Sequence, residues 1–201
     1  MSFDIAVEKR RGDTQVSCRI EGGAGITVLF GPSGVGKTSV LDMVAGLLRP
    51  DAGHVRVAGE SLFDAATGED VAPDRRRAGY VFQDARLFPH LSVRANLLYG
   101  AGDDPAGLDD LATRFGIAHL LDRWPRSLSG GEARRVAIGR ALLAKPRFLL
   151  LDEPLSSLDR ARREEIMLVI EQLRDESGLP ILMVTHDAAE AERLGNRIVE
   201  L

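Results

Sequence analysis

Gly31-Pro32-Ser33-Gly34-Val35-Gly36-Lys37-Thr38 fits the pattern G-x-x-x-x-G-K-[ST], a loop that wraps around phosphate groups. The segment before it, residues 26–30, is apolar, which predicts a buried strand. The segment after it, residues 38–48, has apolar residues at helical spacing. A strand, this loop and a helix form the unit that the pattern requires, so the stretch predicts a phosphate site in an α/β fold.

The residue types in this phosphate loop (residues 31–38) suit a bound anion. Glycine adopts positive φ without strain, so three glycines let the backbone curl and turn its N–H groups toward phosphates. The helix N-terminus adds further donors. Lys37 is placed to reach the β- and γ-phosphates of a nucleotide, and the Thr38 hydroxyl to reach Mg²⁺. The alternative is a glycine-rich turn that matches by chance. The residues expected to contact nucleotide here are Gly31, Pro32, Ser33, Gly34, Val35, Gly36, Lys37, Thr38 and Ser39.

Composition is that of an ordinary globular protein. The chain has 201 residues, 44% apolar and 28% charged, enough for one large domain or two small ones. Its net charge is −4 without a long basic block, which argues against a general affinity for nucleic acid. The short arginine clusters at 75–77, at 134–135 and at 160 and 162–163 are expected to be solvated faces with local ion pairs.

The sequence carries no signal for a membrane span or for secretion. No run of about 18 apolar residues occurs, and charged residues interrupt the first stretch of the chain. Cys18 is the only cysteine, so no internal disulfide is expected, in agreement with a reducing cytoplasm. Any role at a membrane is therefore expected to come through a partner.

Hydrophobic periodicity outlines an α/β chain with one helical insertion. From residue 92 to 124 valine and isoleucine become scarce and helical spacing dominates, with a breaker-rich loop at Gly100–Gly107. This predicts a helical subdomain at 92–124 inserted into a core made of 1–91 and 125–201. Residues 64–74 are expected to be polar and rich in turns. Strands are expected at 3–8, 16–20 (after a turn near Gly12–Asp13), 26–30, 54–57, 61–63, 78–82, 147–152, 180–185 and 196–201, and helices at 38–48, 131–144, 159–177 and 186–194.

Two acids follow the four apolar residues 148–151 of the strand expected at 147–152. In open α/β sheets ligands bind at the carboxyl ends of parallel strands, which is where Asp152 and Glu153 are expected. Asp152 suits the Mg²⁺ site, acting through water. Glu153 is placed to accept a proton from an attacking water. The alternative for the pair is a strand-end cap, which the phosphate loop upstream disfavours.

Leu128-Ser129-Gly130-Gly131-Glu132 resembles the signature of the ATP-binding-cassette (ABC) ATPases. The short signature is specific only in its context: the other motifs of the family occur in this sequence too, and in the same order. These are the phosphate loop, Gln83 at a strand end, the signature, Asp152-Glu153, Ser156-Ser157-Leu158-Asp159, and His186. The match runs from Gly31 to His186. It implies a single ABC ATPase domain over 1–201, with an antiparallel β-subdomain at the N-terminus.

The resemblance implies a site shared by two copies of the chain. In this family two cassettes pair head to tail, so that one ATP lies between the phosphate loop of one and the signature of the other. From the signature side, Ser129, Gly130, Gly131 and Glu132 are implied to contact ATP, with Asp159 bridging the two cassettes. The implied catalytic residues are Glu153, His186, Gln83 and Lys37, and the implied Mg²⁺ ligands are Thr38, Gln83 and Asp152. Hydrolysis would be in-line attack by water without a covalent intermediate. A lone histidine at a strand end is otherwise an ordinary polar residue.

One departure concerns the base. Many family members have an aromatic residue that stacks on adenine about 20 to 25 positions before the phosphate loop. That window holds Glu8-Lys9-Arg10-Arg11 here, and the nearest aromatic residue is Phe3. An arginine plane is an alternative stacking partner. Adenine recognition is therefore less well defined by the sequence than phosphate binding.

The segment from Tyr80 to Val93 resembles importer ATPases, and its amino-acid sequence is most similar to that of molybdate-importer subunits. Glu132, in place of the commoner glutamine, fits the same group. The resemblance implies permease subunits that dock near Asp84–Val93, where Leu87, Phe88 and Leu91 suit docking, their alternative role being internal packing. It also implies a peripheral position on the cytoplasmic side of the inner membrane, and an extracytoplasmic solute-binding protein as an indirect partner.

Several alternatives stay open. Molybdate-importer ATPases usually continue into a small oxyanion-binding regulatory domain, which the resemblance does not reach here, so feedback through it is not expected. The cargo could instead be sulfate, iron or a polyamine. A DNA-repair or chromosome-maintenance ATPase would insert long heptads, but 90 residues without sustained heptads separate Thr38 from Ser129. A nucleotide sensor without hydrolysis is disfavoured by Glu153 and His186.

Overall fold

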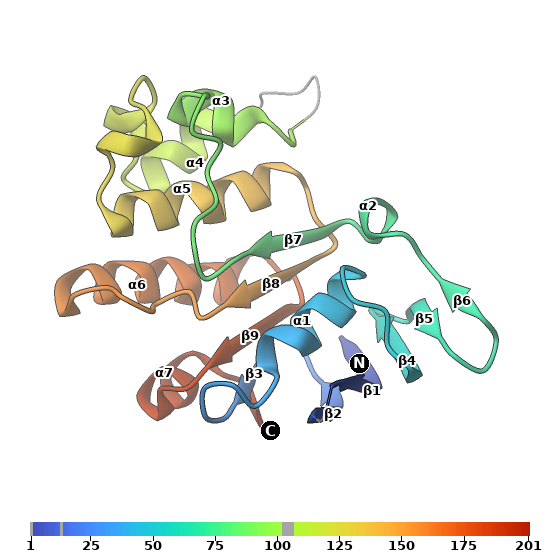
Figure 1. The fold of residues 1–201 in the computed structure, drawn as a ribbon. Helices are drawn as coiled ribbons and strands as arrows, with labels where there is room; N and C mark the ends of the chain where they lie inside the picture. The colour runs from blue at the N-terminus through green and yellow to red at the C-terminus, as the bar shows by residue number, and fades with distance from the viewer. Residues whose placement is uncertain (1, 13, 102–106) are drawn as a thin grey trace.

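Five parallel strands form the central sheet of the protein (Figure 1). This is a computed structural model, in which residues 2–12, 14–101 and 107–201 are described. Every residue of two central strands is buried, as expected for parallel strands covered on both faces. The sheet has the order β10 (Arg197–Glu200), β3 (Ile26–Phe30), β9 (Ile181–Thr185), β8 (Phe148–Asp152) and β7 (Ala78–Val81).

A second, antiparallel sheet is formed mainly by the N-terminal part of the chain. Its long strand pair alternates between buried and exposed residues, with Val16, Cys18 and Ile20 pointing inward. This inner face packs with α1 (Lys37–Ala45) and with Phe148 of β8 in one apolar cluster. The helix that follows the phosphate loop is therefore held between two sheets. The antiparallel sheet has the order β2 (Thr14–Gly22), β1 (Phe3–Arg11), β4 (Ala52–Val57), β5 (Glu60–Asp64) and β6 (Glu69–Asp70).

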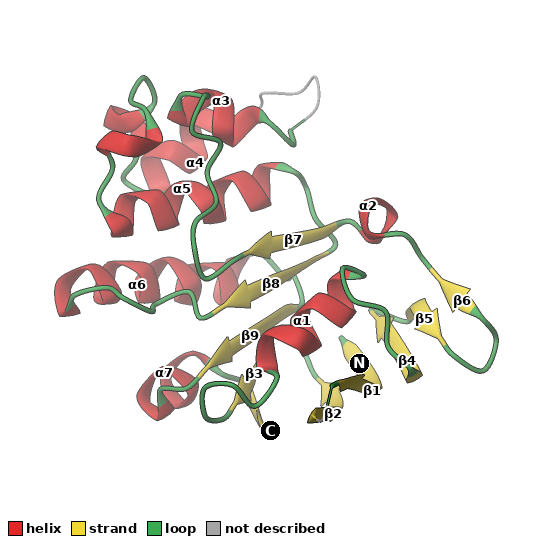
Figure 2. Cartoon of the chain, viewed as in Figure 1, coloured by secondary structure: helices red, strands yellow, loops and turns green. Residues whose placement is uncertain are grey.

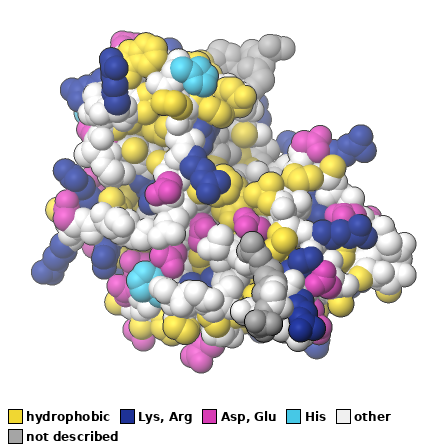
Figure 3. All heavy atoms as spheres, in the orientation of Figure 1, with side chains coloured by type: hydrophobic (Ala, Val, Ile, Leu, Met, Phe, Trp, Pro, Cys, Tyr) yellow, Lys and Arg dark blue, Asp and Glu magenta, His cyan; other side chains and the backbone are white. Residues whose placement is uncertain are grey.

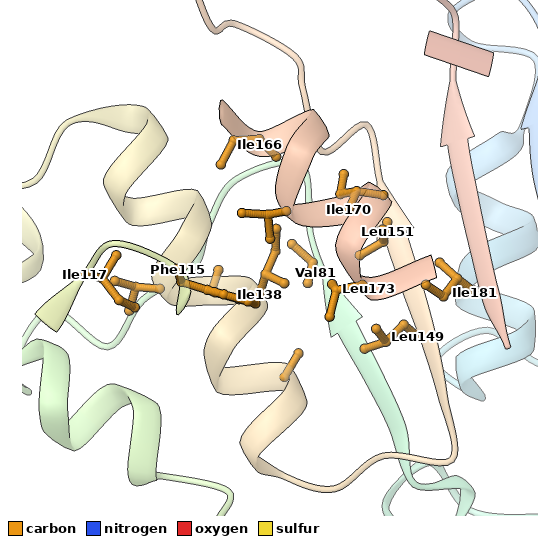
Figure 4. Close-up of a cluster of buried hydrophobic side chains, with 14 of the residues drawn as sticks. Val81, Phe115, Ile117, Ile138, Leu149, Leu151, Ile166, Ile170, Leu173 and Ile181 are labelled. Atoms are coloured by element: carbon orange, nitrogen blue, oxygen red, sulfur yellow. The ribbon is translucent and has the colours of Figure 1, made fainter. Parts of the chain in front are cut away.

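Helices cover the opposite face of the parallel sheet. Figure 4 shows Leu149 and Leu151 of β8 facing Ile170 and Leu173, with Ile138 packed beside them. Figure 2 shows the described part of 92–124 as helices and loops packed above this layer. The division at 92–124 itself stays a prediction, because α5 packs against both α3 and α4. The helices here are α3 (Val93–Leu98), α4 (Leu108–Arg114), α5 (Gly130–Leu143), α6 (Arg160–Glu176), α7 (Ala188–Leu194) and 3₁₀ turns at Ala118–Leu120 and Pro125–Ser127.

The predicted elements at 3–8, 26–30, 131–144 and 159–177 are present with boundary shifts of a few residues. The first helix ends at Ala45 and not at residue 48, because Gly46 adopts a left-handed φ of 81° and closes the last turn. The segment 64–74, predicted to be polar and rich in turns, has a turn at 65–68 and also contains β6 and the first residues of α2 (Pro73–Arg76). The expected turn near Gly12–Asp13 and the loop at Gly100–Gly107 lie partly outside the described residues, at 13 and 102–106.

The distribution of charged side chains on the surface agrees with the small net charge of the chain. Figure 3 shows acidic and basic side chains interspersed over one face, without a field of a single sign. None of the helices in the described part of the chain is both long and apolar enough to cross a membrane.

Arg76 contradicts the expectation that the arginine clusters are solvated, because its side chain is only 1% exposed. Its guanidinium donates hydrogen bonds to the carbonyl oxygens of Met43 and Val44 at 2.9 and 3.0 Å, and to that of Val71 at 2.7 Å. It also pairs with Asp70 at 3.1 Å. A buried cation thus satisfies the carbonyls at the end of α1, where the helix dipole is negative.

Replacing Arg76 by alanine is expected to lower the free energy of unfolding by about 3 kcal/mol, because it leaves buried carbonyls and a carboxylate without their partner. Urea unfolding followed by circular dichroism measures this change. Arg75→Ala is the matched control, since Arg75 is exposed in the same helix, and we expect a change below about 0.5 kcal/mol. Equal losses in the two variants would show that Arg76 does not support α1 in this way.

Candidate active site

The carboxyl ends of four parallel strands bring the predicted site residues together. The phosphate loop follows β3, Asp152 ends β8, and His186 follows β9. Gln83 lies two residues after the end of β7. Figure 1 shows the arrowheads of β7, β8 and β9 pointing to the same side of the molecule. This edge is the ligand-binding edge of open α/β sheets, as the sequence predicts.

The phosphate loop lines a cavity of about 340 Å³ at this edge. Gly36 precedes α1 with a φ of 111°, and a Cβ atom there would lie 2.6 Å from the side chain of Val16. Only glycine therefore permits both the turn and the close approach of β2. The cavity is lined by Ser33, Gly34, Gly36, Lys37, Thr38, Ser39, Gln83 and Glu153.

Lys37 is buried and folds over the loop. Its Nζ donates hydrogen bonds to the carbonyl oxygens of Gly31 and Pro32, both at 2.8 Å. The same Nζ lies 4.0 Å from Oε1 of Glu153. The ammonium group thus lies beside the cavity and close to the N-terminus of α1, where positive charge and backbone donors together favour a polyphosphate.

Thr38 and Asp152 form the part of the site that suits a hard cation. The Thr38 hydroxyl donates to Oδ1 of Asp152 at 3.0 Å. Burial raises the pKa of the Asp152 carboxyl, and the nearby carboxylates of Glu153 and Asp42 raise it further, while Thr38 and Lys37 act in the opposite direction. Mg²⁺ is usually held by one or two protein oxygens together with phosphates and water, and this pair meets that requirement.

Glu153 is the residue on which the other side chains converge. Its Oε1 lies 3.2 Å from Nδ1 of His186, and its Oε2 accepts a long hydrogen bond of 3.4 Å from Nε2 of Gln83. The backbone of Glu153 has a φ of 42°, a left-handed conformation that costs a residue other than glycine about 1 kcal/mol. Its N–H is fixed by the carbonyl of Val184 at 3.1 Å. Strained backbone therefore presents this carboxylate to the cavity.

A second cavity of about 350 Å³ is also lined by Glu153. It shares Ser33, Gln83 and Glu153 with the first cavity and extends to Ser156, Ser157 and His186. Glu153 thus contributes to the lining of both cavities. This arrangement leaves room for a water molecule next to a bound phosphate.

The signature residues lie apart from this cavity. Ser129 caps α5, since its hydroxyl accepts from the N–H of Glu132 at 3.3 Å while the Glu132 carboxylate accepts from the N–H of Ser129 at 2.7 Å. The hydrogen bond from the Ser129 backbone lowers the pKa of the Glu132 carboxyl. Figure 1 shows the start of α5 well separated from the phosphate loop.

Asp159 caps α6 in the same way, accepting from the N–H of Arg162 at 3.0 Å. Neither Asp159 nor residues 129–132 line the two cavities beside Glu153. The predicted site residues therefore fall into two groups. One group converges on Glu153, and the other presents capped helix starts elsewhere on the same chain.

Arg134 is a residue of this region whose position the sequence did not predict. Its guanidinium donates to the carbonyl oxygen of Phe82 at 2.6 Å and to that of Gln83. The expectation of a solvated face is wrong for this residue, because its side chain is buried and burial lowers the pKa of its guanidinium. The signature helix thus holds the backbone of the predicted glutamine directly.

The segment Asp84–Val93, which we call the docking segment, is partly packed. Leu87, Phe88 and Leu91 are half-buried, and buried Asn96 binds the backbone of Phe88 and Leu91 through its side-chain amide. These residues therefore contribute both to packing and to the surface. Phe3 is fully buried, so it is not available to stack on an adenine ring.

Comparisons with known proteins agree with this arrangement. The chain matches the family model described as ABC transporter over residues 14–156. Proteins named "Molybdenum import ATP-binding protein ModC" from Brucella abortus and Rhodospirillum rubrum are each 52% identical to it, over 98% of this chain. The chain covers 56% and 55% of these two proteins, little more than half of their length.

A solved structure supports the fold assignment. CbiO1 from Clostridium perfringens, described as part of the ABC transporter complex CbiONQ, has a TM-score of 0.81 and 27% sequence identity to this chain. The match covers 100% of this chain and 85% of that chain. The α/β core, the antiparallel sheet and the helical layer thus belong to one known architecture.

Proposed function

The chain belongs to the ABC transporter family, and from this membership we propose that it is the ATP-binding and ATP-hydrolysing subunit of an importer. We propose an oxyanion as the cargo, with molybdate preferred. The observation that carries the catalytic part of this proposal is the convergence of Lys37, Gln83 and His186 on the carboxylate of Glu153 beside the phosphate loop.

The proposed reaction is hydrolysis of ATP by direct attack of water. The backbone N–H groups of the phosphate loop and the ammonium group of Lys37 would bind the β- and γ-phosphates. Thr38, Gln83 and Asp152 would hold Mg²⁺, with Asp152 acting through water, and the cation would neutralise phosphate charge. Glu153 would accept the proton of the attacking water, and His186 would contact the γ-phosphate.

We propose that the complete site needs two copies of the chain. Ser129, Gly130, Gly131 and Glu132 lie at a helix N-terminus, which suits an anion, but away from the phosphate loop of their own chain. A head-to-tail dimer would bring this segment onto the ATP of the partner, and Asp159 would bridge the two copies. The catalytic charge would then be stabilised from both sides.

The proposed partners outside the dimer are permease subunits and, indirectly, an extracytoplasmic solute-binding protein. The half-buried apolar residues of the docking segment are the proposed contact, and residues 92–124 are proposed to form a helical subdomain beside it. The protein would lie on the cytoplasmic side of the inner membrane as a peripheral subunit. The names of the relatives support molybdate over sulfate, iron or a polyamine.

Turnover in the assembled transporter tests this function. The chain would be co-purified with the membrane subunits encoded beside its gene and reconstituted in lipid vesicles with the neighbouring solute-binding protein. We expect phosphate release that requires Mg²⁺ and is stimulated by molybdate. Absence of Mg²⁺-dependent release would refute the enzyme assignment, while stimulation by sulfate or ferric iron alone would refute the cargo.

A further inference from the structure

His186 needs support from its surroundings, because its side chain is 49% exposed and stands on a loop between β9 and α7. Three side chains that the proposed mechanism does not use hold this loop. We propose that Thr185, Glu190 and Arg163 are positioning residues that fix His186 against Glu153 for hydrolysis. This inference rests on the proposed function, which it extends by these residues.

The Thr185 hydroxyl connects the two residues that flank His186, because it belongs to one of them and is hydrogen-bonded to the backbone of the other. It is buried, donates a hydrogen bond of 2.6 Å to Oε2 of Glu190, and accepts one of 3.1 Å from the N–H of Asp187. The residues immediately before and after His186 are thus linked through a single oxygen atom. The backbone that carries the imidazole therefore has little freedom to rotate.

A ring of hydrogen bonds joins Thr185, Asp187 and Glu190. Oδ1 of Asp187 caps α7 by accepting from the N–H groups of Ala189 and Glu190, at 2.9 and 3.3 Å. Glu190 is 7% exposed, and burial raises the pKa of its carboxyl. An apolar side chain would fill the same position without the desolvation cost of a carboxyl group. The presence of a carboxyl group at this buried position therefore indicates a role beyond packing.

Arg163 connects this ring to α6. Its Nη1 donates to Oδ2 of Asp187 at 3.3 Å, and its Nε lies 3.9 Å from Oε1 of Glu190. Arg163 lies four residues after Asp159, which caps α6. The segment just before that cap contributes Ser156 and Ser157 to the cavity that also contains His186. Arg163 thus links the first turn of α6, which follows the 156–159 segment where the partner copy is proposed to bind, to the loop that carries His186.

The test measures ATP turnover and nucleotide affinity in the reconstituted transporter. Thr185→Val removes the hydroxyl at nearly constant volume, and we expect kcat to fall about tenfold to a hundredfold with KM within about twofold. Thr185→Ser keeps the hydroxyl and is expected to restore most of kcat. Arg163→Met should resemble Thr185→Val in direction. Glu192→Gln, at an exposed position of α7, is the matched control.

A double-mutant cycle separates positioning from general damage. In a His186→Ala background, Thr185→Val is expected to cause no further loss, because the group that it positions is already gone. The same fold loss in both backgrounds, or a raised KM with unchanged kcat, would overturn the proposal. Thermal unfolding of each variant shows whether lost activity reflects lost structure, and Thr185→Ser provides the comparison that retains the fold.

Amide hydrogen exchange tests the support without nucleotide. We expect faster exchange at Asp187, Ala189 and Glu190 in Thr185→Val than in the wild type, with Thr185→Ser close to the wild type. Unchanged exchange would refute the ring of hydrogen bonds whatever the turnover. A wild type without any ATPase activity would refute the proposed function instead, so the two failures are distinguishable.

Discussion

Glu153→Gln is expected to lower ATP turnover by about a thousandfold while leaving ATP bound. Glutamine has the shape of glutamate but does not accept a proton from water at neutral pH. The phosphate loop, Lys37 and Thr38 are untouched by the change, so the affinity for nucleotide should stay within a few fold. Phosphate release and equilibrium binding of ATP measure the two quantities separately.

The control for this variant is Glu192→Gln, which makes the same chemical change at an exposed position of α7. It should retain wild-type turnover. If Glu153→Gln kept more than about a tenth of the wild-type rate, Glu153 would not be the proton acceptor. The convergence of Gln83 and His186 on its carboxylate would then need another explanation.

Mixed dimers are expected to show that each site is divided between two chains. Two changes are used: Lys37→Ala, which disables a phosphate loop, and Ser129→Arg, which places a bulky cation in a signature. With both changes in one copy and none in the other, every head-to-tail site contains one damaged half, so turnover should be abolished. With one change in each copy, one site is intact, and about half of the turnover should remain.

A site built within one chain predicts the opposite order. The dimer with both changes in one copy would then keep one intact chain, and the dimer with one change in each copy would keep none. Two affinity tags isolate each mixed dimer before phosphate release is measured. Equal turnover in the two arrangements would also contradict the head-to-tail site, because Lys37 and Ser129 would then not act on a shared nucleotide.

Much of the site is predictable because its functional residues lie in short sequence motifs. The phosphate loop follows a buried strand, the two acids stand at the end of β8, and the histidine follows β9, and parallel strands end at one edge of a sheet. Local sequence therefore places Lys37, Asp152 and His186 near one another without knowledge of side-chain packing. The capping positions of Ser129 and Asp159 follow from equally local rules.

The buried charged groups were not predictable in this way. Arg76 caps a helix 32 residues earlier in the chain, and Arg134 binds carbonyls about 50 residues away. An arginine cluster in a sequence is usually solvated, so only the long-range contacts reveal these two exceptions. The ring around Thr185 is similar, since its link to α6 through Arg163 spans 24 residues.

The left-handed backbone of Glu153 has a consequence for engineering the protein. A search for stabilising substitutions would select this position, because glycine relieves the unfavourable φ of 42°. The same substitution would delete the carboxylate on which the site converges. At this position selection for heat tolerance would favour glycine, whereas selection for transport would favour glutamate. Stabilising substitutions should therefore be sought at other positions.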